Sequence, residues 1–147
     1  MIDLRRGTWD DLDRLRAIQT TALDEPWPEL LETAVGGYPP VYVAVDHEPV
    51  GYAVVVPGPE TVAYLPELAV ALERQREGYG SALLEYVCTE LAGDGYDQLR
   101  LSVLATDERA RQFYEQCGFE AIERLPDEFE RGDGILLARE LTADSGD

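Results

Sequence analysis

The order of apolar and polar positions predicts an alternation of helices and strands along most of the chain. A first helix is predicted over 9–22, where apolar residues recur at helical spacing after a capping-box pattern at Thr8 and Asp11. A short second helix is predicted from Pro28, with the proline in its first turn, and should end near Gly36. The N-terminal quarter of the chain is thus expected to be mainly helical.

The next part of the chain predicts three strands. Residues 41–45 and 50–56 are rich in β-branched and aromatic residues, and the short polar link between them indicates an antiparallel hairpin. The segment Pro57-Gly58-Pro59 then breaks the chain before a third extended run over 61–70.

The second half of the chain continues the alternation of helices and strands and indicates the fold class. Its predicted elements are a helix over 78–92, a strand over 99–104, a helix over 107–116 and two closing strands over 119–125 and 135–141. A strand, helix and strand at this spacing form a crossover unit, so 61–70 and 99–104 should be parallel neighbours. We therefore predict one α+β domain of layered helices and strands over 1–142, with a short acidic tail over 143–147. Its sheet should be mixed, mostly antiparallel and of about six or seven strands, with helices on both faces.

Charge narrows the choice of partners. The formal net charge is −18, from 30 acidic and 12 basic residues, and all the basic residues are arginines. Such a surface repels nucleic acids and anionic membranes, so neither is expected as a partner. The acidic residues are spread along the chain, which is typical of a solvated surface. We prefer a cytoplasm of very high salt as the explanation over a surface that gathers cationic substrates.

Cysteine and histidine are scarce. Cys88 and Cys117 are the only cysteines and His47 is the only histidine, which is too few ligands for a Cys/His zinc site, so no metal is expected. No apolar run approaches membrane-spanning length, and residues 1–5 lack the apolar segment of a signal peptide. The sequence therefore predicts a soluble, cytoplasmic protein.

Candidate chemistry begins where the extended run 61–70 leads into a glycine-containing loop. Gly78 and Gly80 lack Cβ atoms, which lets backbone amides approach a phosphate while the start of a helix adds a partial positive charge. Their spacing matches neither the P-loop nor the dinucleotide fingerprint. Two glycines at a helix start are equally consistent with turn chemistry, so a phosphate-bearing cofactor is a hypothesis at this point.

A set of short motifs surrounds this loop in a defined order. The motifs are Leu68-Ala69-Val70, Gln75-x-x-Gly78-x-Gly80, Ala110, Phe113-Tyr114 and Gly118-Phe119. Their joint order and spacing resemble the GNAT superfamily of acetyl-CoA-dependent N-acetyltransferases. The resemblance is detailed over about residues 60–120, and the order of secondary structure agrees over nearly the whole chain.

The resemblance implies acetyl-CoA as co-substrate, with no metal, and assigns it two groups of positions. The strand backbone would hydrogen-bond the pantetheine arm as if the arm were another strand, and the loop would hold the pyrophosphate. The pantetheine positions are Leu68, Ala69 and Val70, and the pyrophosphate positions are Gln75, Arg76, Glu77, Gly78, Tyr79, Gly80 and Ser81. The family often has Asn where this chain has Asp107, for which a helix N-cap is the better interpretation.

Acetyl transfer to an amine needs a proton donor for the leaving thiolate. The resemblance implies that Tyr114 lies near the thioester sulfur, and its hydroxyl suits general acid catalysis. The alternative is a core ring, because Tyr114 shares helical spacing with Ala110 and Cys117.

The reaction also needs a proton acceptor, since an amine with a pKa of about 10 is mostly ammonium near neutral pH. Glu67, beside the pantetheine strand, or an ordered water is the candidate base, and Tyr64 is a second candidate. Strand alternation puts Glu67 on the face opposite Leu68, unless Pro66 marks a bulge that re-aims it. A solvated or bulge-stabilising Glu67 is the alternative.

The leading hypothesis is an acyltransferase that moves an acetyl group from acetyl-CoA directly to a primary amine of a small molecule or peptide in a ternary complex. A non-catalytic acyl-CoA-binding sensor or regulatory domain is the alternative. A homodimer paired through an exposed sheet edge is a further hypothesis. The acceptor amine and the acyl chain length stay open.

Overall fold

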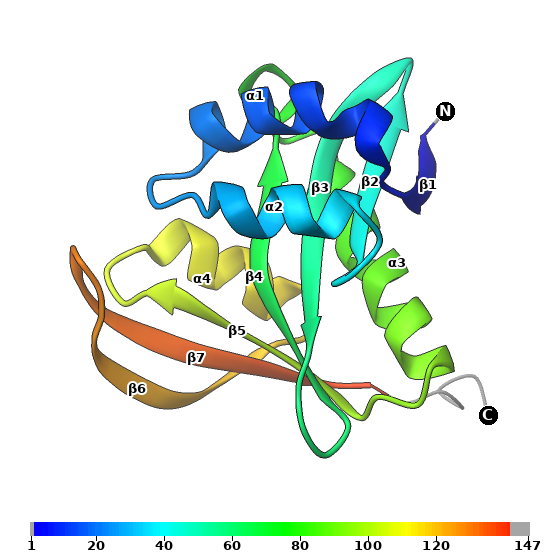
Figure 1. Ribbon diagram of the computed structural model, residues 1–147. Coiled ribbons are helices and arrows are strands. Elements are labelled where there is room, and N and C mark those ends of the chain that lie inside the picture. Colours follow the sequence, from blue (N-terminus) through cyan, green and yellow to red (C-terminus); the bar gives the residue numbers. More distant parts are fainter. Residues whose placement is uncertain (1, 142–147) are drawn as a thin grey trace. The chain divides into compact units, whose positions relative to one another are not determined.

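The computed structural model describes residues 2–141, so the acidic tail predicted over 143–147 lies outside the described residues. In chain order the elements are β1 (Asp3–Arg6), the 3-10 turn η1 (Trp9–Asp11), α1 (Leu12–Ala22), α2 (Pro28–Val35), β2 (Val41–Asp46), β3 (Glu48–Pro57), β4 (Val62–Val70), the 3-10 turn η2 (Leu72–Arg74), α3 (Tyr79–Gly93), β5 (Gln98–Leu104), α4 (Glu108–Gln116), β6 (Glu120–Phe129) and β7 (Gly132–Glu140). The strands belong to a 7-stranded mixed sheet in the order β1-β2-β3-β4-β5-β7-β6 (Figure 1).

The chain divides into two compact units. The first comprises Met1–Val56 and Leu65–Cys88, and the second comprises Pro57–Tyr64 and Thr89–Asp147. Strand β4 and helix α3 each contribute residues to both units.

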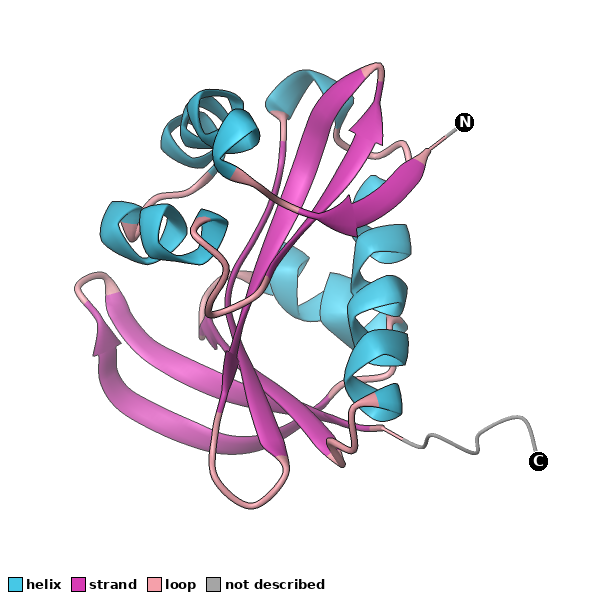
Figure 2. Cartoon of the chain, turned by 45° about the vertical axis from the view of Figure 1, so that its right-hand side comes forward, coloured by secondary structure: helices cyan, strands magenta, loops and turns pink. Residues whose placement is uncertain are grey.

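In the first unit, helices cover both faces of an antiparallel sheet (Figure 2). Val43 of β2 is buried in one cluster with Leu15 of α1 and Leu31 of α2. Its neighbour Tyr42 packs edge-on against Tyr86 of α3, with ring centroids 5.7 Å apart. Because successive side chains of a strand point to opposite faces, α1 and α2 lie on one face and α3 lies on the other.

In the second unit, β5 is flanked by a parallel and an antiparallel neighbour. It pairs in parallel with the start of β4 over three register positions that end at Tyr64 and Arg100, and antiparallel with β7 along its whole length. Strand β6 pairs with β7 and is exposed or partly exposed throughout, with register shifts near Ala121 and Leu125. These features place β6 at the outer edge of the sheet.

Most of the predicted elements are confirmed, including the 41–56 hairpin and the parallel pairing of 61–70 with 99–104. The sheet has the expected mixed character, with seven strands. Strand β1 was not predicted, because it is short and mostly exposed and is defined by its backbone pairing with β2. The capping-box residues Thr8 and Asp11 do interact, since the Thr8 N–H donates to Asp11 Oδ2 at 2.8 Å, but they enclose the turn η1 and not the first turn of α1.

Candidate functional site

The loop between β4 and α3 is turned by two residues in the left-handed region of backbone conformation. Arg76 has a φ of 68° and Gly78 has a φ of 89°. A Cβ built on Gly78 would meet no atom within 4 Å, so the φ value and not crowding favours glycine there. Helical hydrogen bonding begins at this residue, whose carbonyl accepts the Ala82 N–H at 3.0 Å. The loop therefore exposes the start of a 15-residue helix, where the partial charge is positive.

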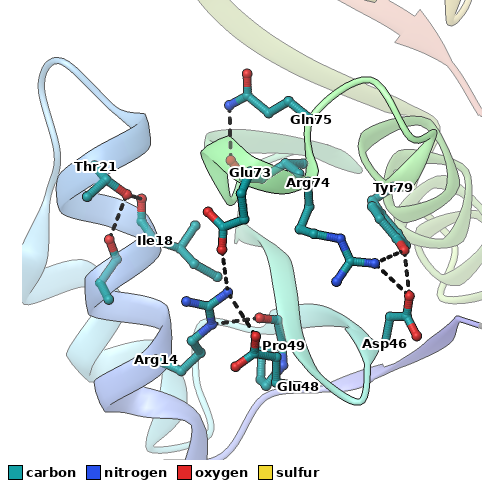
Figure 3. A network of polar contacts seen from close by, with 12 residues as sticks. Arg14, Ile18, Thr21, Asp46, Glu48, Pro49, Glu73, Arg74, Gln75 and Tyr79 are labelled. Carbon is teal, nitrogen blue, oxygen red and sulfur yellow. Dashed lines mark hydrogen bonds and ion pairs between the residues drawn. The ribbon is translucent and has the colours of Figure 1, made fainter.

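Two side chains on either side of this loop turn toward Asp46 at the end of β2 (Figure 3). Arg74 Nη2 and the Tyr79 hydroxyl each donate to Asp46 Oδ2 at 2.7 Å. The hydrogen bonds from Tyr79 and from Arg74 lower the pKa of the Asp46 carboxyl, and Asp46 in turn raises the pKa of the Tyr79 hydroxyl. This cluster of Asp46, Arg74 and Tyr79, called here the Asp46 cluster, ties the start of α3 to β2.

Two further contacts attach the same segment to its surroundings (Figure 3). Arg14 of α1 lies 3.4 Å from the Glu73 carboxylate and donates through Nε to the Pro49 carbonyl at 2.9 Å. Gln75 donates through Nε2 to the Val70 carbonyl at 3.1 Å. The Gln75 side chain is therefore engaged inside the loop, at the end of the strand that precedes it.

Arg76 is the cation that the loop leaves exposed. Within residues 2–141 its side chain forms no hydrogen bond or ion pair, whereas Arg74 is held by Asp46 and by Glu77, 3.4 Å away. An exposed guanidinium, the amides at a helix start and an unobstructed glycine are groups that can bind a phosphate ester. The residues at this loop thus fit the pyrophosphate of a CoA ester.

Side-chain burial alternates along β4 without interruption through Pro66. Glu67 and Ala69 are buried, whereas Leu68 and Val70 are partly exposed, so Glu67 lies on the face opposite Leu68, as strand alternation predicted. The burial pattern therefore agrees with plain strand alternation at Glu67. The Ala71 N–H donates to the Val50 carbonyl of β3 at 2.8 Å. Because neighbouring residues of a strand direct their backbone N–H and C=O groups to opposite sides, those of Val70 point away from β3.

Glu67 is a buried acceptor for three donors. It is 5% exposed, and Oε1 accepts from Gln19 Nε2 at 2.9 Å and from the Tyr52 hydroxyl at 2.7 Å, while Oε2 accepts from the Trp27 N–H at 2.6 Å. Burial and the nearby Glu67 carboxylate raise the pKa of the Tyr52 hydroxyl, so this hydroxyl stays protonated and can donate. The carboxylate therefore joins β4 to β3, to α1 and to the start of α2.

Tyr114 belongs to the second unit, on α4. Its ring packs edge-on against Phe113 and Phe119, with centroids 5.0 Å and 5.6 Å away. Burial raises the pKa of its hydroxyl, which is consequently neutral and able to donate at pH 7. Asp107 caps the same helix by accepting the Ala110 N–H at 3.0 Å, so the N-cap interpretation is confirmed.

Some of these contacts were not foreseen from the sequence. No sequence motif marked Gln19, Tyr52 or Asp46. Of the three, only Gln19 could have been noticed, because it is a polar residue on the buried apolar face of α1, and a buried polar side chain needs a hydrogen-bond partner. Within the described part of the chain, no group of three or more His, Cys, Asp or Glu side chains could hold a metal ion, and no helix there is long and apolar enough to cross a membrane.

A mixed sheet whose β4 leads through a turned loop into α3 defines this protein as one with an acetyltransferase fold. The chain belongs to the acetyltransferase (GNAT) family, whose family model matches residues 8–119. Comparison with curated protein sequences gives no match.

Solved structures agree with this assignment. The ribosomal-protein-S18-alanine N-acetyltransferase from Escherichia coli is 25% identical, with a TM-score of 0.87 over 97% of this chain and 95% of that chain. Ard1 from Thermoplasma volcanium is 24% identical, with a TM-score of 0.87 over 95% of this chain and 97% of that chain. A GNAT family acetyltransferase from Elizabethkingia anophelis, solved with acetyl-CoA bound, is 22% identical, with a TM-score of 0.81 over 95% and 98% of the two chains.

Proposed function

We propose that this protein is an N-acetyltransferase that transfers an acetyl group from acetyl-CoA directly to a primary amine in a ternary complex. The observation that carries the proposal is the loop before α3, where Arg74, Gln75 and Tyr79 are engaged within the protein while Gly78 and Arg76 are exposed. Membership of the acetyltransferase family supports the same conclusion.

Acetyl-CoA would supply the activated acetyl thioester. In this proposal the pantetheine arm is bound by the backbone of Leu68, Ala69 and Val70. The pyrophosphate is bound by the loop and the first turn of α3, at Gln75, Arg76, Glu77, Gly78, Tyr79, Gly80 and Ser81. The Arg76 guanidinium would offset part of the phosphate charge, which matters in a chain with a net charge of −18.

Tyr114 is the proposed general acid. The Tyr114 hydroxyl is protonated at pH 7 and so has a proton to donate to the departing thiolate, and general acid catalysis is typically worth about 10²–10⁴ in rate. The incoming ammonium must lose its proton first, and Glu67 or a water molecule is the proposed acceptor. No acyl-enzyme is needed, because direct attack by the amine completes the transfer.

The acceptor is proposed to be a primary amine of a small molecule or of a peptide. The Escherichia coli relative acts on an alanine of a ribosomal protein, which supports the peptide branch of this proposal. We also propose a cytoplasmic location. A homodimer through the sheet edge stays a prediction, and the register shifts and Pro126 in β6 are features that usually oppose pairing at an edge.

Two measurements on the wild-type protein test the proposal. Calorimetry in high salt should detect CoA binding, and a thiol-release assay with acetyl-CoA and a panel of amines should detect turnover. Binding without thiol release for any amine would favour the alternative, a non-catalytic acyl-CoA-binding sensor or regulatory domain. Absence of CoA binding would contradict both functions.

A further inference from the structure

The segment Pro26-Trp27-Pro28 has a single backbone N–H, because proline has none. That N–H, from Trp27, donates to Glu67 Oε2 at 2.6 Å. Trp27 is also the N-cap of α2, with φ −121° and ψ 81°, a conformation outside the α region that a following proline disfavours. One hydrogen bond therefore fixes the point at which the loop after α1 ends and α2 begins.

The two ends of this hydrogen bond differ sharply in exposure. The Trp27 side chain is 54% exposed, whereas Glu67 is 5% exposed. An indole that is so exposed is held in place less by core packing than by its backbone. Glu67 thus holds the backbone of Trp27, whose indole ring is exposed to solvent.

The other contacts of Glu67 make it a poor acceptor for a substrate proton. Gln19 and Tyr52, which both donate to Oε1, are 0% exposed. An ionised carboxylate has about four lone-pair sites. Three of those of Glu67 are occupied by protein donors, and almost none of its surface is accessible to an amine. A general base must reach the proton that it removes.

We propose that Glu67 is a positioning residue that acts through Trp27. It fixes the loop 23–27 so that the Trp27 indole offers a rigid face to the cationic acceptor amine, and a water molecule takes the proton of that amine. The indole face attracts an ammonium group, which is the form in which the acceptor arrives. This inference rests on the proposed function and chooses between the two proton acceptors left open above.

The first experiment needs no substrate. The chain has two tryptophans, so Trp9→Phe leaves Trp27 as the only one. In that background, Glu67→Gln should increase acrylamide quenching of Trp27 and lower its fluorescence anisotropy, because an amide cannot accept all three hydrogen bonds. Tyr52→Phe, which leaves the Trp27 bond in place, should have a smaller effect, and melting curves check that each variant is folded.

A matched control is available on α2, the helix that Trp27 caps. Glu32 of α2 is exposed and pairs with Arg16 of α1 at 2.8 Å, so Glu32→Gln removes the same charge and one α1–α2 contact without touching Trp27. It should leave the quenching of Trp27 unchanged. Equal quenching in the Glu67→Gln and Glu32→Gln proteins would overturn the proposal, and this result does not depend on whether the protein binds CoA.

The second experiment separates positioning from proton transfer. With spermidine and a short peptide with an N-terminal alanine as probes, Glu67→Gln should raise the KM for the amine about tenfold or more, which is the loss expected for a hydrogen bond to a charged group. The Kd for CoA and the acidic limb of the pH–rate profile should be unchanged. Loss of the acidic limb with an unchanged KM would instead make Glu67 the base.

Discussion

The Tyr79 hydroxyl donates to Asp46 Oδ2 at 2.7 Å, which joins the first residue of α3 to the last residue of β2. The same oxygen accepts from Arg74 at 2.7 Å, so both residues that flank the loop are held by one carboxylate. The Asp46 cluster therefore preorganises the loop before any ligand arrives, and a preorganised loop loses less conformational entropy on binding.

Replacing the carboxylate should loosen this loop. We expect Asp46→Asn to weaken CoA binding about tenfold in calorimetry, because the Arg74 and Tyr79 hydrogen bonds would go to a neutral and not to a charged acceptor. Asp133→Asn is the control, since Asp133 pairs with Arg124 at 3.0 Å within the second unit and, in the described part of the chain, forms no hydrogen bond or ion pair with Asp46, Arg74 or Tyr79. Equal CoA affinity in the two variants would exclude a role for the Asp46 cluster in binding.

The same carboxyl predicts a dependence of stability on acid. Its pKa is lowered in the folded protein, so its contribution is present above the unfolded pKa of about 3.9 and is lost as the pH falls through the lower folded value. The difference in free energy of unfolding between wild type and Asp46→Asn should thus be constant from about pH 8 to 5 and shrink below about pH 4. Urea unfolding over this range measures it, and a difference that already shrinks above pH 5 would contradict the assignment.

Gly78 should be sensitive to substitution for a backbone reason. Gly78→Ala forces alanine to a φ of 89° and should cost about 1 kcal/mol of stability, and its methyl group should obstruct a phosphate held against the loop. Gly93→Ala is the matched control, since its Cβ also meets no atom and its φ is not left-handed. We expect that change to stabilise the helix by about 0.5–1 kcal/mol. Thermal melts and CoA titrations of both variants test this contrast.

Tyr114→Phe should separate chemistry from packing. The phenylalanine keeps the ring contacts with Phe113 and Phe119, so the melting temperature should change little. Turnover with acetyl-CoA and a reactive amine should fall at least about tenfold if the hydroxyl protonates the leaving thiolate. An unchanged turnover would leave Tyr114 with a packing role alone.

The sequence was informative wherever a local pattern decides the structure. The crossover helix and its parallel strands follow from periodicity, and the cap at Asp107 follows from residue type. Strand β1 escaped prediction because it has no apolar alternation and depends on its pairing with β2. Pairing between strands that are distant in the chain forms only on folding, so it gives no pattern in the local sequence.

The candidate site was harder to predict in its side-chain contacts. The partners of Glu67 lie 48, 40 and 15 residues away in the chain, and Tyr79 lies 33 residues from Asp46. Contacts over such separations have no periodic signal. The glycine pattern predicted a turned loop between β4 and α3, which the structure has. It did not reveal that Arg74, Gln75 and Tyr79 make contacts within the protein.

The hydrogen bond from the Trp27 backbone N–H, which lies between two prolines, to the buried Glu67 carboxylate has a practical consequence for protein engineering. A transplant of residues 23–27 from another acetyltransferase would need to keep a residue other than proline at position 27, or Glu67 would lose one of its three donors. Exchanges in this loop can therefore change the side chain at position 27 freely, as long as it is not proline and Glu67 is kept.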